Sequence, residues 1–152
     1  MVRPLRPDDA ALYPVFDAAL TEEDRRFRFF TGSPNISASQ VHRLVAFDRR
    51  TARAFIAIDP DTGVMLGVGR LHGMGPGLGE FAVVVRSDLK GCGLGRALMA
   101  EVDEAAASLS ILSMVGYVLR DNAGMLAFCR SLGFMFENAP GDASIVLARR
   151  DL

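Results

Sequence analysis

Three glycines at alternate positions form the segment of this sequence best suited to chemistry. Gly91, Gly93 and Gly95 follow an apolar run and precede a run with helical spacing. A backbone without side chains can fold closely around a ligand. The first N–H groups of a helix lack partners within the helix, and together with the helix dipole they favour an anion. The pattern therefore predicts a cradle for a pyrophosphate group.

Two common nucleotide-binding loops do not fit this segment. A Rossmann loop requires glycine at the sixth position of G-x-G-x-x-G, but counting from Gly91 or Gly93 gives Arg96 or Leu98. A P-loop requires Gly-Lys-Ser/Thr, whereas Gly95 is followed by Arg96 and Ala97. A glycine-rich turn that binds nothing is the remaining alternative.

A second segment has the pattern of a capped helix. Asn122 is a favourable N-cap, and Gly133 stands where a glycine often follows the end of a helix. Phe134 comes directly after it. This arrangement is common in isolation, so its position one strand after the glycine-rich segment gives it significance.

The surrounding elements predict an α+β fold, with a mostly antiparallel mixed sheet and one parallel βαβ unit. Apolar and capping patterns predict a short strand over residues 2–6 and helices over 8–20, from 21 towards 30, and from 37 onward. A hairpin over 54–58 and 64–72 leads through a glycine-rich loop, 73–79, to a central strand, 80–86. A helix over 94–107, a strand over 111–119, a helix ending near 132 and strands over 134–136 and 144–148 complete the order.

Composition excludes several classes of protein. The 152 residues suit one domain, 1–152, and a formal charge of −1 gives no reason to expect a nucleic-acid or membrane partner. No apolar run approaches the ~20 residues of a membrane span. Cys92 and Cys129 make no disulfide framework, and the two histidines have no metal-ligand spacing, so we expect a cytoplasmic protein without a metal. The oligomeric state is not indicated.

The two motifs together resemble those of the GNAT (Gcn5-related) N-acetyltransferases. The family's pattern [Gln/Arg]-x-x-Gly-x-Gly/Ala falls on Lys90, Gly93 and Gly95, with lysine replacing Gln or Arg, and its Asn-to-Gly-Phe motif falls on residues 122–134. The resemblance implies a GNAT fold whose splayed strands hold acetyl-CoA as cosubstrate. It assigns the cofactor to Phe81, Ala82, Val83, Val84, Val85, Lys90, Gly91, Cys92, Gly93, Leu94, Gly95, Arg96, Asn122, Met125, Phe128 and Cys129.

One position departs from the family pattern. Many members have a tyrosine where this chain has Cys129, and that tyrosine protonates the departing thiolate. A buried thiol is better read as a small apolar residue than as an acid. The departing CoA thiolate, whose conjugate acid has a pKa of ~8.5, can leave unassisted or take a proton from water.

Glu80 is the candidate base. An amine must be neutral to attack a thioester, and a lysine amine in water is protonated, with a pKa near ~10.4. Glu80 begins the central strand, just before the backbone assigned to the cofactor, and can accept the proton directly or through water. If the preceding strand pairs with this one, His72 lies near Glu80 and is a second candidate. A solvated strand-end glutamate is the alternative.

A narrower resemblance concerns the acceptor. Segments 3–9, 23–30, 59–63, 66–71 and 80–91 are similar to the acetyltransferase domain of bacterial protein lysine acetyltransferases. This similarity implies that Glu80 is catalytic and that the acceptor is a lysine on a protein, such as an acyl-CoA synthetase. An enzyme that acetylates a small amine and a non-catalytic acyl-CoA-sensing module are the two alternatives.

The charged segment 22–28 has two interpretations. Glu22 and Arg26, and likewise Asp24 and Arg28, lie four residues apart, which is the ordinary pattern of a solvated helix face. The other interpretation is that its arginines contact an acidic protein partner.

Overall fold

The computed structural model describes residues 1–29 and 36–152. Over these residues the strands form one seven-stranded sheet in the order β1-β2-β3-β4-β5-β7-β6. The strands are β1 (Val2–Pro4), β2 (Ala52–Ile58), β3 (Met65–Gly75), β4 (Leu78–Val85), β5 (Ser113–Leu119), β6 (Met135–Asn138) and β7 (Ile145–Asp151). All neighbours are antiparallel except β4 and β5, which are parallel and joined by α4 (Leu94–Ser108), so the predicted α+β order and βαβ unit are confirmed.

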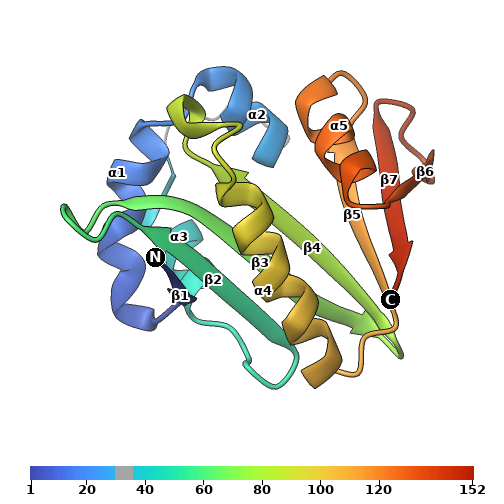
Figure 1. The fold of residues 1–152 in the computed structure, drawn as a ribbon, viewed down its shortest axis with the longest axis horizontal. Helices are drawn as coiled ribbons and strands as arrows, with labels where there is room; N and C mark the ends of the chain where they lie inside the picture. Colours follow the sequence, from blue (N-terminus) through green and yellow to red (C-terminus); the bar gives the residue numbers. More distant parts are fainter. Residues whose placement is uncertain (30–35) are drawn as a thin grey trace.

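The helices lie on both faces of the sheet (Figure 1). The N-terminal helices η1 (Pro7–Leu12), α1 (Tyr13–Ala18), α2 (Glu22–Phe29) and α3 (Ala38–Val45) gather beside β1–β4 and across the end of the sheet, α4 crosses the opposite face, and α5 (Ala123–Ser131) lies beside β5 and β7. None of the described helices is long and apolar enough to cross a membrane.

The predicted helix over 8–20 is wrong in one respect, because the segment is a 3-10 helix followed by a short α-helix. Pro14 stands at the start of α1, where its missing N–H needs no partner. The helix from 37 is confirmed, with the side chain of Ser37 accepting from the Gln40 backbone N–H at 3.1 Å. The end of the predicted helix at residue 30 lies outside the described residues.

The predicted glycine-rich loop over 73–79 is also wrong, since both strands extend through it and turn at residues 76–77. Gly77 takes the positive φ of 71° that this tight turn requires. Gly79 is needed for a different reason: a Cβ there would lie 2.6 Å from the Ile111 side chain. Glycine here marks close packing within a strand, which the letters alone do not distinguish from a loop.

Two apolar cores lie on opposite faces of the sheet. One is shared with α4 and α5 and includes Leu71, Leu98 and Met114. The other, beneath the N-terminal helices, includes Tyr13 and Val68. Residues therefore alternate along β3 between the α4 face and the face of the N-terminal helices.

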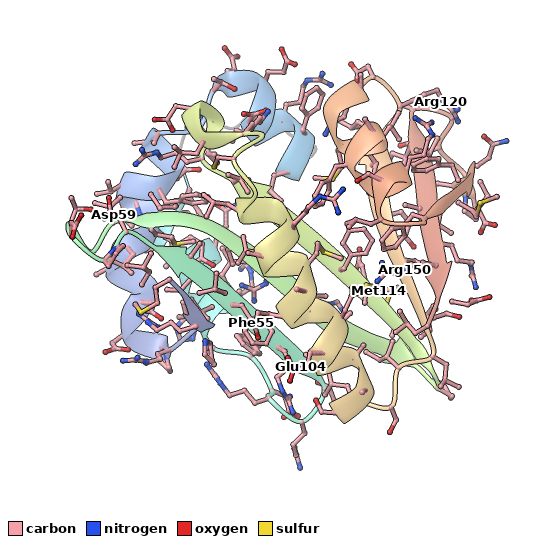
Figure 2. The ribbon with its side chains drawn as sticks, viewed as in Figure 1. Phe55, Asp59, Glu104, Met114, Arg120 and Arg150 are labelled. Carbon is pink, nitrogen blue, oxygen red and sulfur yellow. The ribbon has the colours of Figure 1, made fainter. Side chains whose placement is uncertain are left out.

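Arg150 attaches the C-terminal strands to α4. Its guanidinium pairs with Asp103 of α4, donates to the Leu132 carbonyl at 2.9 Å and lies 4.6 Å from the centre of the Phe134 ring. Figure 2 shows Arg150 and Met114 in the region between α4 and the C-terminal elements. We call β1–β4 with α4 the first arm, and β5, α5, β6 and β7 the second arm; Arg150 holds the two together.

Candidate cofactor cleft and acceptor face

The two arms separate part-way along β4 and β5. Within the described chain, these strands pair at Leu78–Ser113, Gly79–Met114 and Glu80–Val115, and the ladder ends there. Both strands continue, β4 to Val85 and β5 to Leu119. The two strands therefore diverge immediately after Glu80 (Figure 1), and we call the region between the arms beyond this point the candidate cleft.

An aromatic side chain occupies the point of separation. A Cβ at Gly116 would lie 2.5 Å from Cε1 of Phe81, so the Phe81 ring fills the space where a side chain of residue 116 would stand. The Phe81 ring also packs on Phe134, with 4.8 Å between ring centres. The ring thus lies across the α4 side of the two strands at the first residues beyond their ladder.

The glycine-rich segment between β4 and α4 has the geometry expected of an anion cradle. Gly91 and Gly93 have φ values of 81° and 92°, and a Cβ at either would meet no atom within 4 Å. Gly93 is the N-cap of α4, and among the described residues no side chain caps this helix. Its first N–H groups therefore have no capping side chain there, and the residues fit a pyrophosphate.

Gly95 differs from these two glycines. A Cβ at residue 95 would lie 3.2 Å from the Phe128 ring, so Gly95 lets the start of α4 approach α5. Arg96 also reaches α5 and donates to the Ser131 hydroxyl at 2.9 Å. The mouth of the cleft is therefore bordered by both helices.

The second arm places its predicted residues on α5. The side chain of Asn122 accepts from the Met125 backbone N–H at 3.1 Å, which confirms it as the N-cap. Met125 and Phe128 are half-buried against the core of α4 and α5. Cys129 is completely buried in that core, and burial raises the pKa of its thiol to about 11. It occupies the place of a small apolar residue, without surface to offer a ligand.

Lys90 lies in a setting that the motif does not indicate. Its ammonium pairs with the carboxylate of Asp24 on α2. The same carboxylate accepts from the Ser87 hydroxyl at 2.5 Å, and the Ser87 oxygen accepts from the Thr21 backbone N–H at 2.9 Å. The segment before α4 is thus bonded to the first turn of α2.

The charged segment 22–28 is therefore not a simple solvated face. Asp24 is buried and is bonded to Lys90 and Ser87, and Arg26 pairs with Asp121 of the second arm at 2.9 Å. Sequence reasoning missed Asp24 because its partners lie more than sixty positions away, and the spacing of four to Arg28 suggested a local pair instead.

Glu80 and His72 are brought together as predicted. They are directly paired residues of β4 and β3, so their side chains lie on the same face of the sheet. That face is the one of the N-terminal helices, because Arg70, two residues before His72, donates to the Tyr13 hydroxyl at 3.4 Å and the Leu44 carbonyl at 2.7 Å. Glu80 is half-buried and His72 is exposed.

Arg28 of α2 interacts electrostatically with Glu80. Burial lowers the pKa of the Arg28 guanidinium, and the opposite charge of Glu80 partly restores it, which places the two groups within electrostatic reach. A cavity of about 20 Å³ beside Arg28 and Arg70 has room for about one water molecule.

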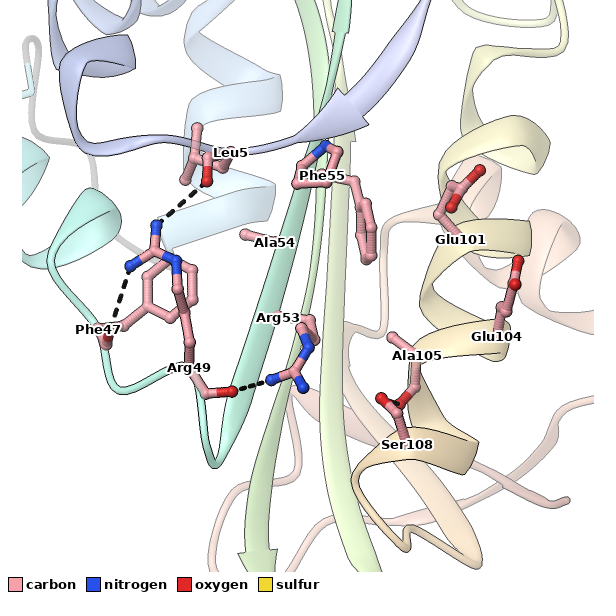
Figure 3. A pocket seen from close by; sticks show the side chains of 11 residues that line it. Leu5, Phe47, Arg49, Arg53, Ala54, Phe55, Glu101, Glu104, Ala105 and Ser108 are labelled. Carbon is pink, nitrogen blue, oxygen red and sulfur yellow. Dashed lines mark hydrogen bonds between the residues drawn. The ribbon is translucent and has the colours of Figure 1, made fainter.

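A larger groove lies away from this cleft. Its volume is about 620 Å³, and Figure 3 shows Arg49 and Arg53 on one side and Glu101 and Glu104 of α4 on the other. None of its described lining residues belongs to the predicted site.

The comparisons with known proteins agree with this geometry. The family model described as an acetyltransferase (GNAT) domain matches residues 1–135. A curated acetyltransferase of Pseudomonas aeruginosa is 28% identical over 152 residues, covering 98% of this chain and 82% of the relative.

Solved structures give the same result. The GNAT domain of S. lividans PAT superposes with a TM-score of 0.91 at 25% identity, covering 99% of this chain and 89% of that one. The PaiA N-acetyltransferase of Thermoplasma acidophilum, solved with coenzyme A, has the same fold, with a TM-score of 0.75 at 15% identity and coverage of 100% and 98%. Since the family model spans most of the sequence, this chain belongs to the GNAT family and is an acetyl-CoA-dependent N-acetyltransferase.

Proposed function

We propose that this enzyme transfers the acetyl group to a lysine side chain of a protein, with Glu80 as the base. The observation that carries the proposal is the position of Glu80 at the last paired residue before the cleft opens, on the face of the N-terminal helices. The S. lividans PAT domain, which belongs to a protein acetyltransferase, supports a protein acceptor through its similarity over nearly the whole chain.

In this proposal, one set of residues binds the cofactor and Glu80 accepts the proton. Acetyl-CoA supplies an activated thioester. The N–H groups at the start of α4 would hold the pyrophosphate, and the backbone of residues 81–85 would border the cofactor's extended arm. This arrangement directs the thioester towards the point of separation, where Glu80 lies.

The transfer requires one proton acceptor. The neutral amine nitrogen attacks the thioester carbon, the N–C bond forms, and the C–S bond breaks. Glu80 removes the proton of the attacking nitrogen, directly or through a water. The sulfur leaves as a thiolate and takes its proton from water, because the completely buried Cys129 presents no acid to the cleft. His72, exposed beside Glu80, is the second candidate base.

An acceptor screen tests the choice of substrate. The protein is incubated with labelled acetyl-CoA and either a cell lysate or a panel of polyamines, amino acids and amine drugs. We expect label in protein bands, and peptide mapping should place it on lysine side chains. Label in small amines alone would assign a small-molecule acceptor, and tight CoA binding without turnover in any arm would indicate an acyl-CoA-sensing module.

Glu80→Gln tests the base. The substitution keeps the shape and polarity of the side chain but cannot accept the proton, so the turnover rate should fall by roughly 10²–10⁴. CoA affinity should remain unchanged, and part of the lost rate should return between about pH 7 and 10 as more of the lysine amine becomes neutral. Steady-state kinetics over this range are the measurement.

Glu137→Gln is the matched control, because Glu137 is an exposed carboxylate on β6, away from the cleft. It should leave the rate unchanged. Near-normal turnover of Glu80→Gln at neutral pH would transfer the role to His72, and loss of CoA binding would make Glu80 a structural residue.

A further inference from the structure

α2 lies at the mouth of the cleft and contacts both arms (Figure 1). Its first turn is bonded to the segment before α4 through Asp24, and Arg26 pairs with Asp121, which precedes α5. The Arg26–Asp121 pair is solvent-exposed, with 42% and 65% of the side chains accessible, so it contributes little to stability. The contacts of Asp24 differ from this pair because the Asp24 side chain is buried.

Asp24 is the centre of a small polar network. Its side chain is 9% exposed, its carboxylate receives the Lys90 ammonium and the Ser87 hydroxyl, and its backbone N–H donates to the Thr21 hydroxyl at 3.1 Å. Burial raises the pKa of the Asp24 carboxyl, but the hydrogen bonds from Lys90 and Ser87 outweigh this effect and leave the pKa lowered. The carboxylate is therefore charged at neutral pH.

The other hydrogen bonds of this segment are local: the Leu89 N–H donates to the Arg86 carbonyl at 2.9 Å, and the Cys92 thiol donates to the Leu89 carbonyl at 2.7 Å. Ser87 and Lys90 stand immediately before Gly91 and Gly93, where no side chain packs and both φ values are positive. Such a segment loses much conformational freedom when it must adopt one conformation around a ligand. Contacts that fix its N-terminal side before the ligand arrives reduce that loss.

We propose that Asp24 is a positioning residue for CoA binding, which acts through Lys90 and Ser87 to hold the glycine-rich segment in its ligand-binding conformation. The inference rests on the proposed cofactor cradle and adds to it a residue of the N-terminal helices, outside both sequence motifs. Because α2 also carries Arg28 towards Glu80, one helix joins the cofactor segment to the acceptor face.

Calorimetric titration with CoA tests the proposal. Asp24→Asn keeps the size of the side chain but removes the charge paired with Lys90, and the dissociation constant for CoA should rise roughly tenfold, the worth of one hydrogen bond to a charged group. The KM for acetyl-CoA should rise in parallel while kcat changes little. In a Lys90→Met background, Asp24→Asn should raise the dissociation constant for CoA by a clearly smaller factor, because the Asp24–Lys90 pair is already lost.

A buried carboxylate elsewhere provides the control for general destabilisation. Asp9 is equally buried and accepts two bonds from Arg3, at 2.7 and 2.8 Å, far along the chain from the glycine-rich segment. Asp9→Asn should lower thermal stability without changing CoA affinity. Unchanged or tighter CoA binding in Asp24→Asn overturns the proposal, tighter binding because it would mean that Asp24 withholds Lys90 from the phosphates.

A second pair of variants separates this inference from the cradle itself. Gly93→Val should weaken CoA binding strongly. Gly63→Val should leave CoA affinity unchanged, although Gly63 is a turn glycine with a φ of 73° and equally open space. If Gly93→Val leaves the affinity unchanged, the cradle assignment fails. If it weakens binding and Asp24→Asn does not, the role of Asp24 alone is refuted.

Discussion

At the scale of single residues, Cys129 shows how burial turns a chemically reactive type into a packing residue. Its thiol stands where related enzymes have a proton-donating tyrosine, yet it is completely enclosed between α5 and the sheet. Burial raises its pKa from 9.0 to about 11. An acid this weak and this enclosed contributes to the core of the second arm and leaves proton delivery to solvent.

The same shift predicts how stability depends on pH. Between about pH 9 and 11 the unfolded thiol loses its proton while the folded thiol keeps it, so the unfolded state binds fewer protons and the free energy of unfolding falls as pH rises. The slope attributable to Cys129 is roughly 1.4 kcal/mol per pH unit. Urea unfolding of wild type and Cys129→Ala at several pH values isolates it. Equal slopes in the two proteins would mean that the folded thiol ionises freely.

At the scale of elements, the end of the β4–β5 ladder coincides with a close contact between Phe81 and Gly116. Phe81 and Gly116 are the first residues beyond the ladder, and the ring of one occupies the Cβ space of the other. The ladder therefore ends at the level where a large side chain packs over a residue that has none.

Gly116→Ala tests whether positions 81 and 116 share one space. The added methyl group would lie 2.5 Å from the ring, and overpacking of this kind should cost roughly 1–3 kcal/mol of unfolding free energy in urea titrations. In a Phe81→Leu background the same substitution should cost clearly less, because the smaller side chain leaves room. Additive costs would show that the two positions do not share one space.

Several elements could be predicted because their determinants are local. The capping box of Ser37 and Gln40 and the N-cap of Asn122 each depend on residues three positions apart. The pairing of His72 with Glu80 follows from a hairpin with a short turn. Glycines were harder, since residues 73–79 combine a real turn with strand positions where only a side-chain-free residue packs.

At the scale of the whole molecule, the parts that sequence reasoning missed are those that join distant segments. Asp24 and Lys90 are 66 positions apart, and Arg150 and Asp103 are 47 apart. The sequence does not show which distant residue a charged side chain pairs with. The nearest opposite charge along a helix is therefore an unreliable guide to its partner. The motifs predicted the cofactor segment and the candidate base, whereas the contacts that fix the two arms and α2 required the three-dimensional arrangement.

The end of the β4–β5 ladder affects how the protein behaves when no cofactor is bound. Beyond Glu80 the β5-facing side of β4 has no ladder partner among the described residues, so the middle of the sheet contains a strand edge. Strand edges accept any extended chain that can pair with their main-chain groups. The pantetheine arm of the cofactor, extended and bearing amides, is well suited to serve as the missing strand. An extended segment of a neighbouring polypeptide can pair with the same strand edge. We therefore expect the bound cofactor to protect the chain from self-association as well as to supply its acetyl group.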